Sequence, residues 1–143
     1  MATRICILII LIFGSFFTIE ASTKEVAEGK IAPMVVKLNL AKAVMCESLK
    51  EKEFINEAIV FSVLISKVIC FTDFDSVPDK TFVYHNWYFR EQKRASVKLT
   101  LNSPRWATFS TVQRGETDKG PWRVEITDPQ GNILKTLRFS ITD

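Results

Sequence analysis

The sequence predicts an all-β domain, an immunoglobulin-like antiparallel β-sandwich of seven or eight strands preceded by an N-terminal signal helix. Two observations predict this fold. Short apolar segments, several alternating with polar residues, follow one another after residue 34, with turn-forming residues about every 8–12 positions. Eleven Phe and three Trp in 143 residues also supply ample apolar surface for one small core. We therefore divide the chain into a leader at 1–21, a linker at 22–34 and a β-sandwich domain at 35–143.

The leader has the arrangement of a secretory signal peptide. Arg4 supplies positive charge, the apolar run Ile5–Ile19 follows, and Ala21 stands at a candidate cleavage position. As a helix this run would rise only about 22 Å, less than the roughly 30 Å of a bilayer core. We expect a periplasmic or secreted domain with no stable membrane span after cleavage. The alternative is an uncleaved segment that anchors the protein in the inner membrane, because Ile19 and Glu20 fit a cleavage site poorly.

Charge and cysteine content limit the classes of function. The formal net charge of +3 is too small to indicate a nucleic-acid partner. Cys46 and Cys70 remain after the leader is removed, and two thiols in an oxidising compartment are most simply interpreted as one structural disulfide. The alternatives are two free buried thiols or a redox or metal site, although the C-x-x-C spacing of redox pairs is absent.

The first half of the domain predicts three strands. Val35–Glu47 alternates and then turns apolar, which indicates one long or bulged strand. Ser48–Glu57 is highly charged and predicts a solvated loop or a single helical turn. Ala58–Phe74 is rich in Val, Ile and Phe, which favours two strands, Ile59–Ile65 and Val68–Thr72. A single buried helix is the alternative, because a continuous apolar run fits both structures.

The run Thr81–Arg90, TFVYHNWYFR, is predicted to be the strand on which the sandwich is built. It contains five aromatic residues and the single histidine of the sequence. The preceding segment, Asp73–Lys80, predicts a turn. The polar turn Glu91–Arg94 joins the central run to the alternating strand Ser96–Leu101, so the two should form a hairpin.

The remaining residues predict three more strands. Alternation indicates strands at Arg105–Val112, around Trp122–Thr127 and around Leu137–Ile141. Pro, Gly, Asn and Asp mark turns at Asn102–Pro104 and Asp128–Asn132. The regular spacing of these strands supports the sandwich prediction.

His85 is the first candidate for chemistry, as a general base or a metal ligand. Its position on the predicted strand puts it on the same face as Val83 and Trp87, which indicates a structural histidine at the edge of the aromatic core. No G-x-S-x-G or H-E-x-x-H motif accompanies it. We therefore predict no enzymatic activity and no cofactor, with an uncharacterised enzyme using His85 as an alternative.

Three aspartates, Asp73, Asp75 and Asp79, lie close together before the central run. Calcium binds carboxylate oxygens at such spacings, but Pro78 occupies the place where an EF-hand loop requires Gly. We expect a solvated turn and no metal site, with a calcium site as the alternative.

A candidate binding surface combines aromatic and basic residues. Arg90 and Arg105 belong to a basic stretch that we interpret as a wet strand face, or as a surface for an anionic glycan, lipid headgroup or acidic protein. Trp106 begins its strand, so its burial is less strongly indicated than that of Trp122. The predicted surface consists of His85, Arg90, Arg105 and Trp106.

Four motifs in the second half occur together in a characteristic order: Tyr84–Tyr88, Pro104–Ser110, Gly120–Ile126, and Gly131–Leu134 with Arg138-Phe139. On these motifs the chain resembles the bacterial domain of unknown function numbered 2914, over roughly Ala43 to Ile141 and most clearly after Phe82. It departs from that family at Glu53-Phe54, where Glu-Pro is common, and at Ser110-Thr111, where Ser-Lys is common. The resemblance implies export in Gram-negative bacteria, and it implies no catalytic residue.

These observations together predict a non-catalytic, exported envelope domain that acts as a protein-interaction or accessory module. Its expected partner is an envelope protein or a glycan. A carbohydrate-binding module is the main alternative, and it requires at least one exposed Trp or Tyr beside polar groups.

Overall fold

The computed structural model describes residues 37–51, 53–113 and 115–143. The predicted signal helix, its cleavage site and the linker lie outside these ranges. Within them, no helix is long and apolar enough to cross a membrane.

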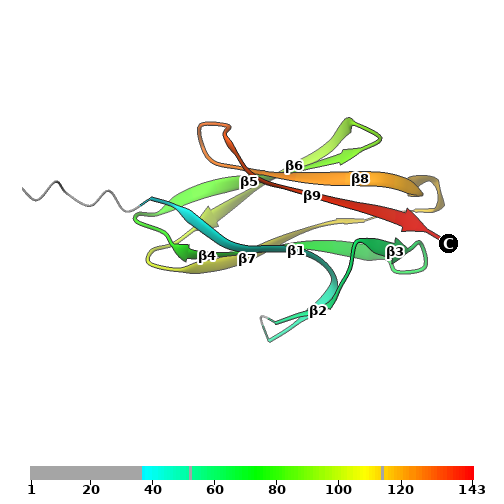
Figure 1. Cartoon of the computed structure of the whole chain (residues 1–143), viewed down its shortest axis with the longest axis horizontal. Helices are drawn as coiled ribbons and strands as arrows, with labels where there is room; N and C mark the ends of the chain where they lie inside the picture. The colour runs from blue at the N-terminus through cyan, green and yellow to red at the C-terminus, as the bar shows by residue number, and fades with distance from the viewer. Residues whose placement is uncertain (1–36, 52, 114) are drawn as a thin grey trace, which may run out of the picture. The chain divides into compact units, whose positions relative to one another are not determined.

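The described residues form nine β-strands in two sheets that face each other, so the predicted all-β sandwich is confirmed at this level (Figure 1). One sheet, sheet A, has the order β2-β1-β4-β7, and the other, sheet B, has the order β3-β9-β8-β5-β6. The strands are β1 (Asn39–Lys50), β2 (Glu53–Glu57), β3 (Val60–Ser62), β4 (Lys67–Ser76), β5 (Thr81–Phe89), β6 (Gln92–Leu101), β7 (Trp106–Gln113), β8 (Gly120–Thr127) and β9 (Ile133–Thr142), with a 3-10 turn η1 at Glu116–Asp118. The predicted number of seven or eight strands was therefore too low.

Strand β5 is the central run, as predicted, and it lies between β8 and β6 in sheet B. Its hairpin with β6 is also confirmed, but the turn is shorter than predicted. Arg90 and Glu91 both have positive φ, 46° and 65°, as a two-residue hairpin turn of type I′ requires. Pairing therefore resumes at Gln92, and Lys93 and Arg94 belong to the strand rather than to the turn.

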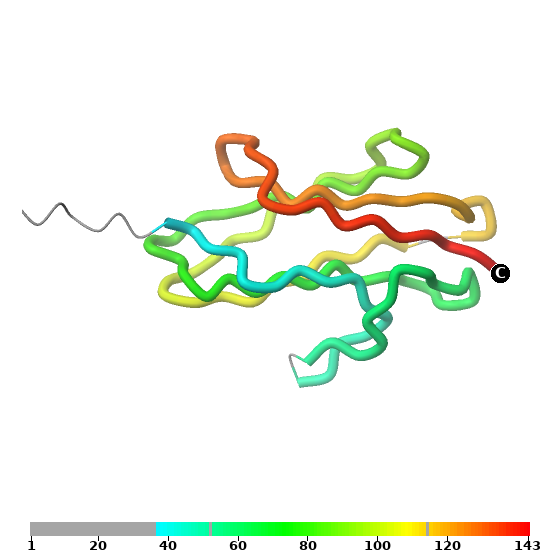
Figure 2. The backbone as a smooth tube through the Cα atoms, viewed as in Figure 1, coloured from blue at the N-terminus to red at the C-terminus, as the bar shows by residue number. Residues whose placement is uncertain are grey.

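The segment Ser48–Glu57 is not a loop: β1 continues to Lys50 and turns back as β2. Leu49 lies opposite Phe54 in this hairpin, so two apolar side chains meet next to the charged pair of Lys50 and Glu53. The chain path in Figure 2 shows this hairpin turning away from the two layers on the sheet A side. Register shifts between Asn39 and Lys42 confirm that β1 is bulged.

The apolar run Ala58–Phe74 forms two strands, β3 and β4, and not a helix. Strand β3 is only three residues long and pairs in parallel with β9, an exception to the predicted antiparallel arrangement. Strand β4 extends to Ser76, so Asp73 and Asp75 lie on a strand and not in the predicted turn. Their carboxylates are accommodated there because Arg105 and Asn39 donate hydrogen bonds to them.

The main core lies between the sheets and is rich in aromatic rings. Trp122 stacks on Phe139 with ring centroids 6.0 Å apart, and Trp87 meets the same phenyl edge-on at 6.2 Å. Trp122, Val124 and Ile126 are all buried, which confirms the predicted inward face of β8.

The predicted disulfide between Cys46 and Cys70 is wrong. Both thiols are free and fully buried. Cys70 lies opposite Met45, while Cys46 lies opposite Ile69, so the two cysteines are one position out of register. Successive residues of a strand point to opposite faces. Cys70 therefore belongs to the main core between the sheets, and Cys46 belongs to a separate cluster on the outer face of sheet A.

Candidate functional site

His85 lies in a buried polar network between the two sheets. Its Nδ1 is 2.8 Å from Ser110 Oγ on β7, and its Nε2 is 3.3 Å from Thr72 Oγ1 on β4. Thr72 gives its single hydroxyl proton to the Thr108 carbonyl at 3.3 Å, so its oxygen can only accept from Nε2, while Ser110 Oγ accepts from Trp87 Nε1 at 3.0 Å and donates to Nδ1. The imidazole is then the neutral Nε2–H tautomer.

Burial explains why this histidine stays neutral. The side chain has no exposed area, and desolvation lowers its pKa from 6.5 to about 4. The prediction of a structural histidine beside Val83 and Trp87 matches this position, whereas the placement of His85 on a binding surface is wrong. The enzyme alternative requires an imidazole open to a cleft, and the ring is instead enclosed between β4, β5 and β7.

An open groove of about 700 Å³ lies on the outer face of sheet A. Its lining is mainly apolar, with charged groups at its rim, and comprises Leu49, Glu51, Phe71, Asp73, Arg105, Trp106, Ala107, Thr108 and Phe109. The volume is within the range of roughly 300–1,000 Å³ that ligand sites occupy. We call this feature the outer groove.

The β1–β2 hairpin forms one wall of the outer groove. Phe54 packs against Phe71 with ring centroids 5.7 Å apart, and Lys42 Nζ lies 4.0 Å from the centroid of the Phe54 ring. Leu49 and Phe54 thereby cover a small apolar cluster beneath the hairpin that includes Cys46 and Phe71. The hairpin that projects from this side of sheet A thus adds a wall beside the strand surface, and the surface becomes concave.

Strand β7 forms the opposite wall and carries the most exposed aromatic groups of the groove. Phe109 is 51% exposed and Trp106 is 39% exposed. Beside them, Arg105 binds Asp73 through two contacts, Nε to Oδ1 at 3.3 Å and Nη2 to Oδ2 at 2.5 Å. The Asp73 carboxylate raises the pKa of Arg105, so this guanidinium is a fixed cation at the groove rim.

The structure brings together two residues of the predicted binding surface, Arg105 and Trp106. Arg90 lies elsewhere, at the β5–β6 turn, where its Nη2 donates to the Lys119 carbonyl at 3.2 Å. Phe71 and Phe109 were not among the predicted site residues. The alternation of Phe109 with Ser110 in a short strand was a pattern from which its direction could have been predicted. Phe71 lies in a continuous apolar run, and such a run does not indicate which side chains point outward.

Residues 80–141 match the model of a family described as "Protein of unknown function (DUF2914)". The match covers almost all of the segment from β5 to β9, which is therefore similar to this family. The predicted resemblance is confirmed over these residues, and its weaker extension back to Ala43 lies outside the match. No curated protein matches the chain.

The DUF2914 segment supplies only part of the outer groove. Arg105, Trp106 and Phe109 lie within the matched residues, whereas Leu49 and Phe71 precede them. The groove is therefore completed by the β1–β2 hairpin and by β4, which the family match does not reach.

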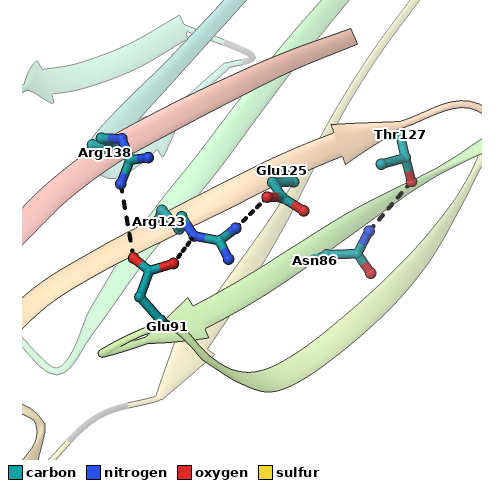
Figure 3. Close-up of polar contacts among 6 residues, drawn as sticks. All are labelled: Asn86, Glu91, Arg123, Glu125, Thr127 and Arg138. Atoms are coloured by element: carbon teal, nitrogen blue, oxygen red, sulfur yellow. Dashed lines mark hydrogen bonds and ion pairs between the residues drawn. The ribbon is translucent and has the colours of Figure 1, made fainter. Parts of the chain in front are cut away.

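The outer face of sheet B carries a ladder of satisfied polar contacts within the same segment (Figure 3). Arg123 Nε donates to Glu91 at 2.8 Å, and Arg123 also pairs with Glu125. Asn86 uses both ends of its amide, donating to Thr127 at 3.3 Å and accepting from the Ser96 hydroxyl at 2.7 Å. The polar side chains of this face are paired with one another, and we do not assign the binding site to it.

The three aspartates do not converge on a metal site. Asp73 is engaged by Arg105, and Asp75 accepts a hydrogen bond from Asn39 Nδ2 at 2.7 Å. Within the described ranges, no group of three or more His, Cys, Asp or Glu side chains could hold a metal ion. Nothing in the described part of the chain supports the calcium alternative.

Proposed function

We propose that this protein is a non-catalytic, exported envelope domain with an immunoglobulin-like fold, and that the outer groove binds an extended segment of a partner protein. The observation that carries the proposal is the half-exposed Phe109, which lies with the apolar residues Leu49 and Phe71 and with the Arg105–Asp73 pair along the outer groove. Aromatic residues and Arg are enriched at protein interfaces, and buried aromatic anchors dominate their energetics.

The chemistry of the groove favours a polypeptide as the partner. Leu49, Phe71 and Phe109 give it apolar walls that suit an aliphatic or aromatic side chain. The Arg105 side chain is 66% exposed even while it binds Asp73, so its remaining donor groups can reach a peptide carbonyl or a carboxylate. One anchoring side chain with an adjacent peptide group fits both features.

A carbohydrate-binding module is the second candidate, and one observation favours it. Trp87 and Trp122 are buried, but Trp106 is 39% exposed and lies beside the charged pair of Arg105 and Asp73. A sugar could stack on that indole and bind the charged groups. The apolar walls of the groove make a peptide the better fit.

Site-specific photocrosslinking in the native envelope tests the protein-binding proposal. A benzophenone amino acid in place of Phe109 should give a discrete adduct with a partner polypeptide, which mass spectrometry identifies. The same group in place of Ile133, which is 56% exposed on β9, is the matched control and should give no such adduct.

A second substitution separates the two candidates. Trp106→Ala should weaken the Phe109 adduct severalfold if the groove binds a protein. Identical adducts from positions 109 and 133 would contradict the groove as the site. Binding to a glycan array that disappears in Trp106→Ala, without a protein adduct, would instead assign the carbohydrate function.

A further inference from the structure

The four strands at the sheet edges differ in how well they are protected from pairing with another strand. The edge strand β6 carries Lys93, Arg94 and Lys98, and the edge strand β2 carries Glu53 and Glu57. Charged side chains and short length are the usual means by which proteins keep sheet edges unpaired. Strand β3 is protected in the second way, because it is three residues long.

Strand β7 lacks both kinds of protection. Its eight residues, WATFSTVQ, include no charged residue and no proline. Among the described residues β7 pairs with β4 alone, so its other side presents a row of backbone groups with no strand beside them. Phe109, near the middle of the strand, is 51% exposed on the outer face of sheet A.

We propose that β7 pairs antiparallel with β7 of a second copy of this chain, so that the two copies of sheet A form one continuous sheet across a two-fold axis. The lack of charge is what makes a second copy a suitable partner. In a symmetric antiparallel pair each strand faces its own sequence, so a strand with several charges of one sign, such as β6, would repel itself.

The alternation of β7 restricts the register of this pair. Residues directly opposite each other point to the same face, so an outward residue must oppose an outward residue. Centring the pair on Phe109 places the two half-exposed phenyl rings opposite each other, Ala107 opposite Thr111, and Trp106 opposite Val112. Centring it on Ser110 would instead oppose Phe109 to Thr111 and leave Trp106 without an apolar partner.

The register centred on Phe109 also brings no like charges together. Beyond the end of β7, Arg105 would oppose Gln113 of the copy, and its guanidinium is already bound by Asp73. The pairing uses the edge of β7 and stands whether or not the outer groove binds a partner. It would place the two outer grooves on one continuous face.

Cysteine crosslinking in the full chain tests both the pairing and its register. The parent protein carries Cys6→Ser, and its remaining thiols, Cys46 and Cys70, are buried. Under mild oxidation in the envelope, Phe109→Cys should give a disulfide-linked dimer on a nonreducing gel. Ala107→Cys and Thr111→Cys should each give at least tenfold less dimer alone, but should crosslink to each other when co-expressed.

Lys98→Cys on the charged edge strand β6 is the matched control and should stay monomeric. No dimer from Phe109→Cys, or equal dimer from Lys98→Cys, would overturn the proposal. An adduct between Phe109→Cys and another polypeptide in place of the second copy would overturn it too, and would assign the β7 edge to a partner protein.

A charge exchange provides an independent measurement that does not depend on thiols. Native mass analysis of the full chain in detergent should show that Ala107→Lys combined with Thr111→Lys lowers the dimer fraction at least tenfold. Ala107→Lys combined with Thr111→Glu should restore it, because opposite charges then face each other twice. Loss of the dimer in both double variants, with both folded, would contradict the proposed register.

Discussion

The imidazole of His85 makes stability depend on pH in a predictable direction. Its pKa is lowered from 6.5 to about 4 by burial, so the unfolded chain takes up the proton more readily than the folded one. The stabilisation from the neutral ring is therefore complete above pH 6.5 and is lost as the pH falls toward 4. The difference corresponds to an upper limit on the order of 3 kcal/mol.

Urea unfolding at pH 7.5 and pH 4.5 measures this effect. We expect the free energy of unfolding to fall by ~2–3 kcal/mol between the two values, and the fall to be largely absent in His85→Gln, whatever the stability of that variant at pH 7.5. The pKa of Asp128 is lowered chiefly by a hydrogen bond from Asn132. The stabilisation from this carboxylate is therefore lost only as the pH falls below its ordinary pKa, which lies outside this window. An equal fall in the parent protein and in His85→Gln would contradict the assignment of this pH dependence to His85.

Local alternation was sufficient to place this histidine but not its partners. The spacing of Val83, His85 and Trp87 predicted that the ring points inward, and it does. Thr72 and Ser110 come from strands of the opposite sheet, so their approach depends on how the two layers are superposed. The failed disulfide has the same origin, because a register offset of one residue sends Cys46 and Cys70 to opposite faces.

At the scale of elements, the β1–β2 hairpin is held by few apolar contacts. Phe54→Ala removes the ring that packs on Phe71 and should lower the free energy of unfolding by about 1–2 kcal/mol. It should also accelerate amide hydrogen exchange in β2 while leaving β5 and β8 unchanged, because the hairpin can open without separating the sheets. Ile55→Ala, at a position 38% exposed on the same strand, is the control and should change stability by less than about 0.5 kcal/mol.

The same hairpin shows why sequence patterns located some strands and missed others. β5 and β8 carry clear alternation on a buried face, and both strands were predicted from it. In β2, Glu53 and Glu57 flank the apolar pair Phe54 and Ile55, so the composition is that of a solvated loop. The segment is a strand because it pairs with β1 and because Phe54 packs on Phe71. The second contact is long-range, so the outer groove that the hairpin completes could not be predicted from local patterns.

At the scale of the whole molecule, the two-layer architecture followed from strand spacing, but the order of strands did not. β7 follows β6 directly in sequence, yet it crosses to sheet A and pairs with β4. β3 leaves its neighbour β4 and pairs with β9 at the far end of the chain. Such long-range pairings decide which strands become edges, so neither the outer groove nor the uncharged β7 edge could be derived from local patterns.

The reactivity of the two thiols, Cys46 and Cys70, reports on whether the two sheets remain packed together. Cys70 lies between the sheets with no exposed area, and Cys46 is equally covered outside sheet A. Burial also raises the pKa of both thiols, that of Cys46 to about 11, so little thiolate forms at neutral pH. Cys70 should therefore react with a thiol reagent only when the sheets separate.

The labelling rate of Cys70, measured by mass spectrometry, should follow the rate of global unfolding, measured by tryptophan fluorescence, as the denaturant concentration increases. Cys46 lies under the β1–β2 hairpin, so Phe54→Ala should accelerate its labelling more than that of Cys70. Full denaturation without reductant should expose two reactive thiols between residues 37 and 143. Rapid labelling of Cys70 in the native protein, or a chain two mass units lighter with no reactive thiol, would contradict the packing described for the two sheets.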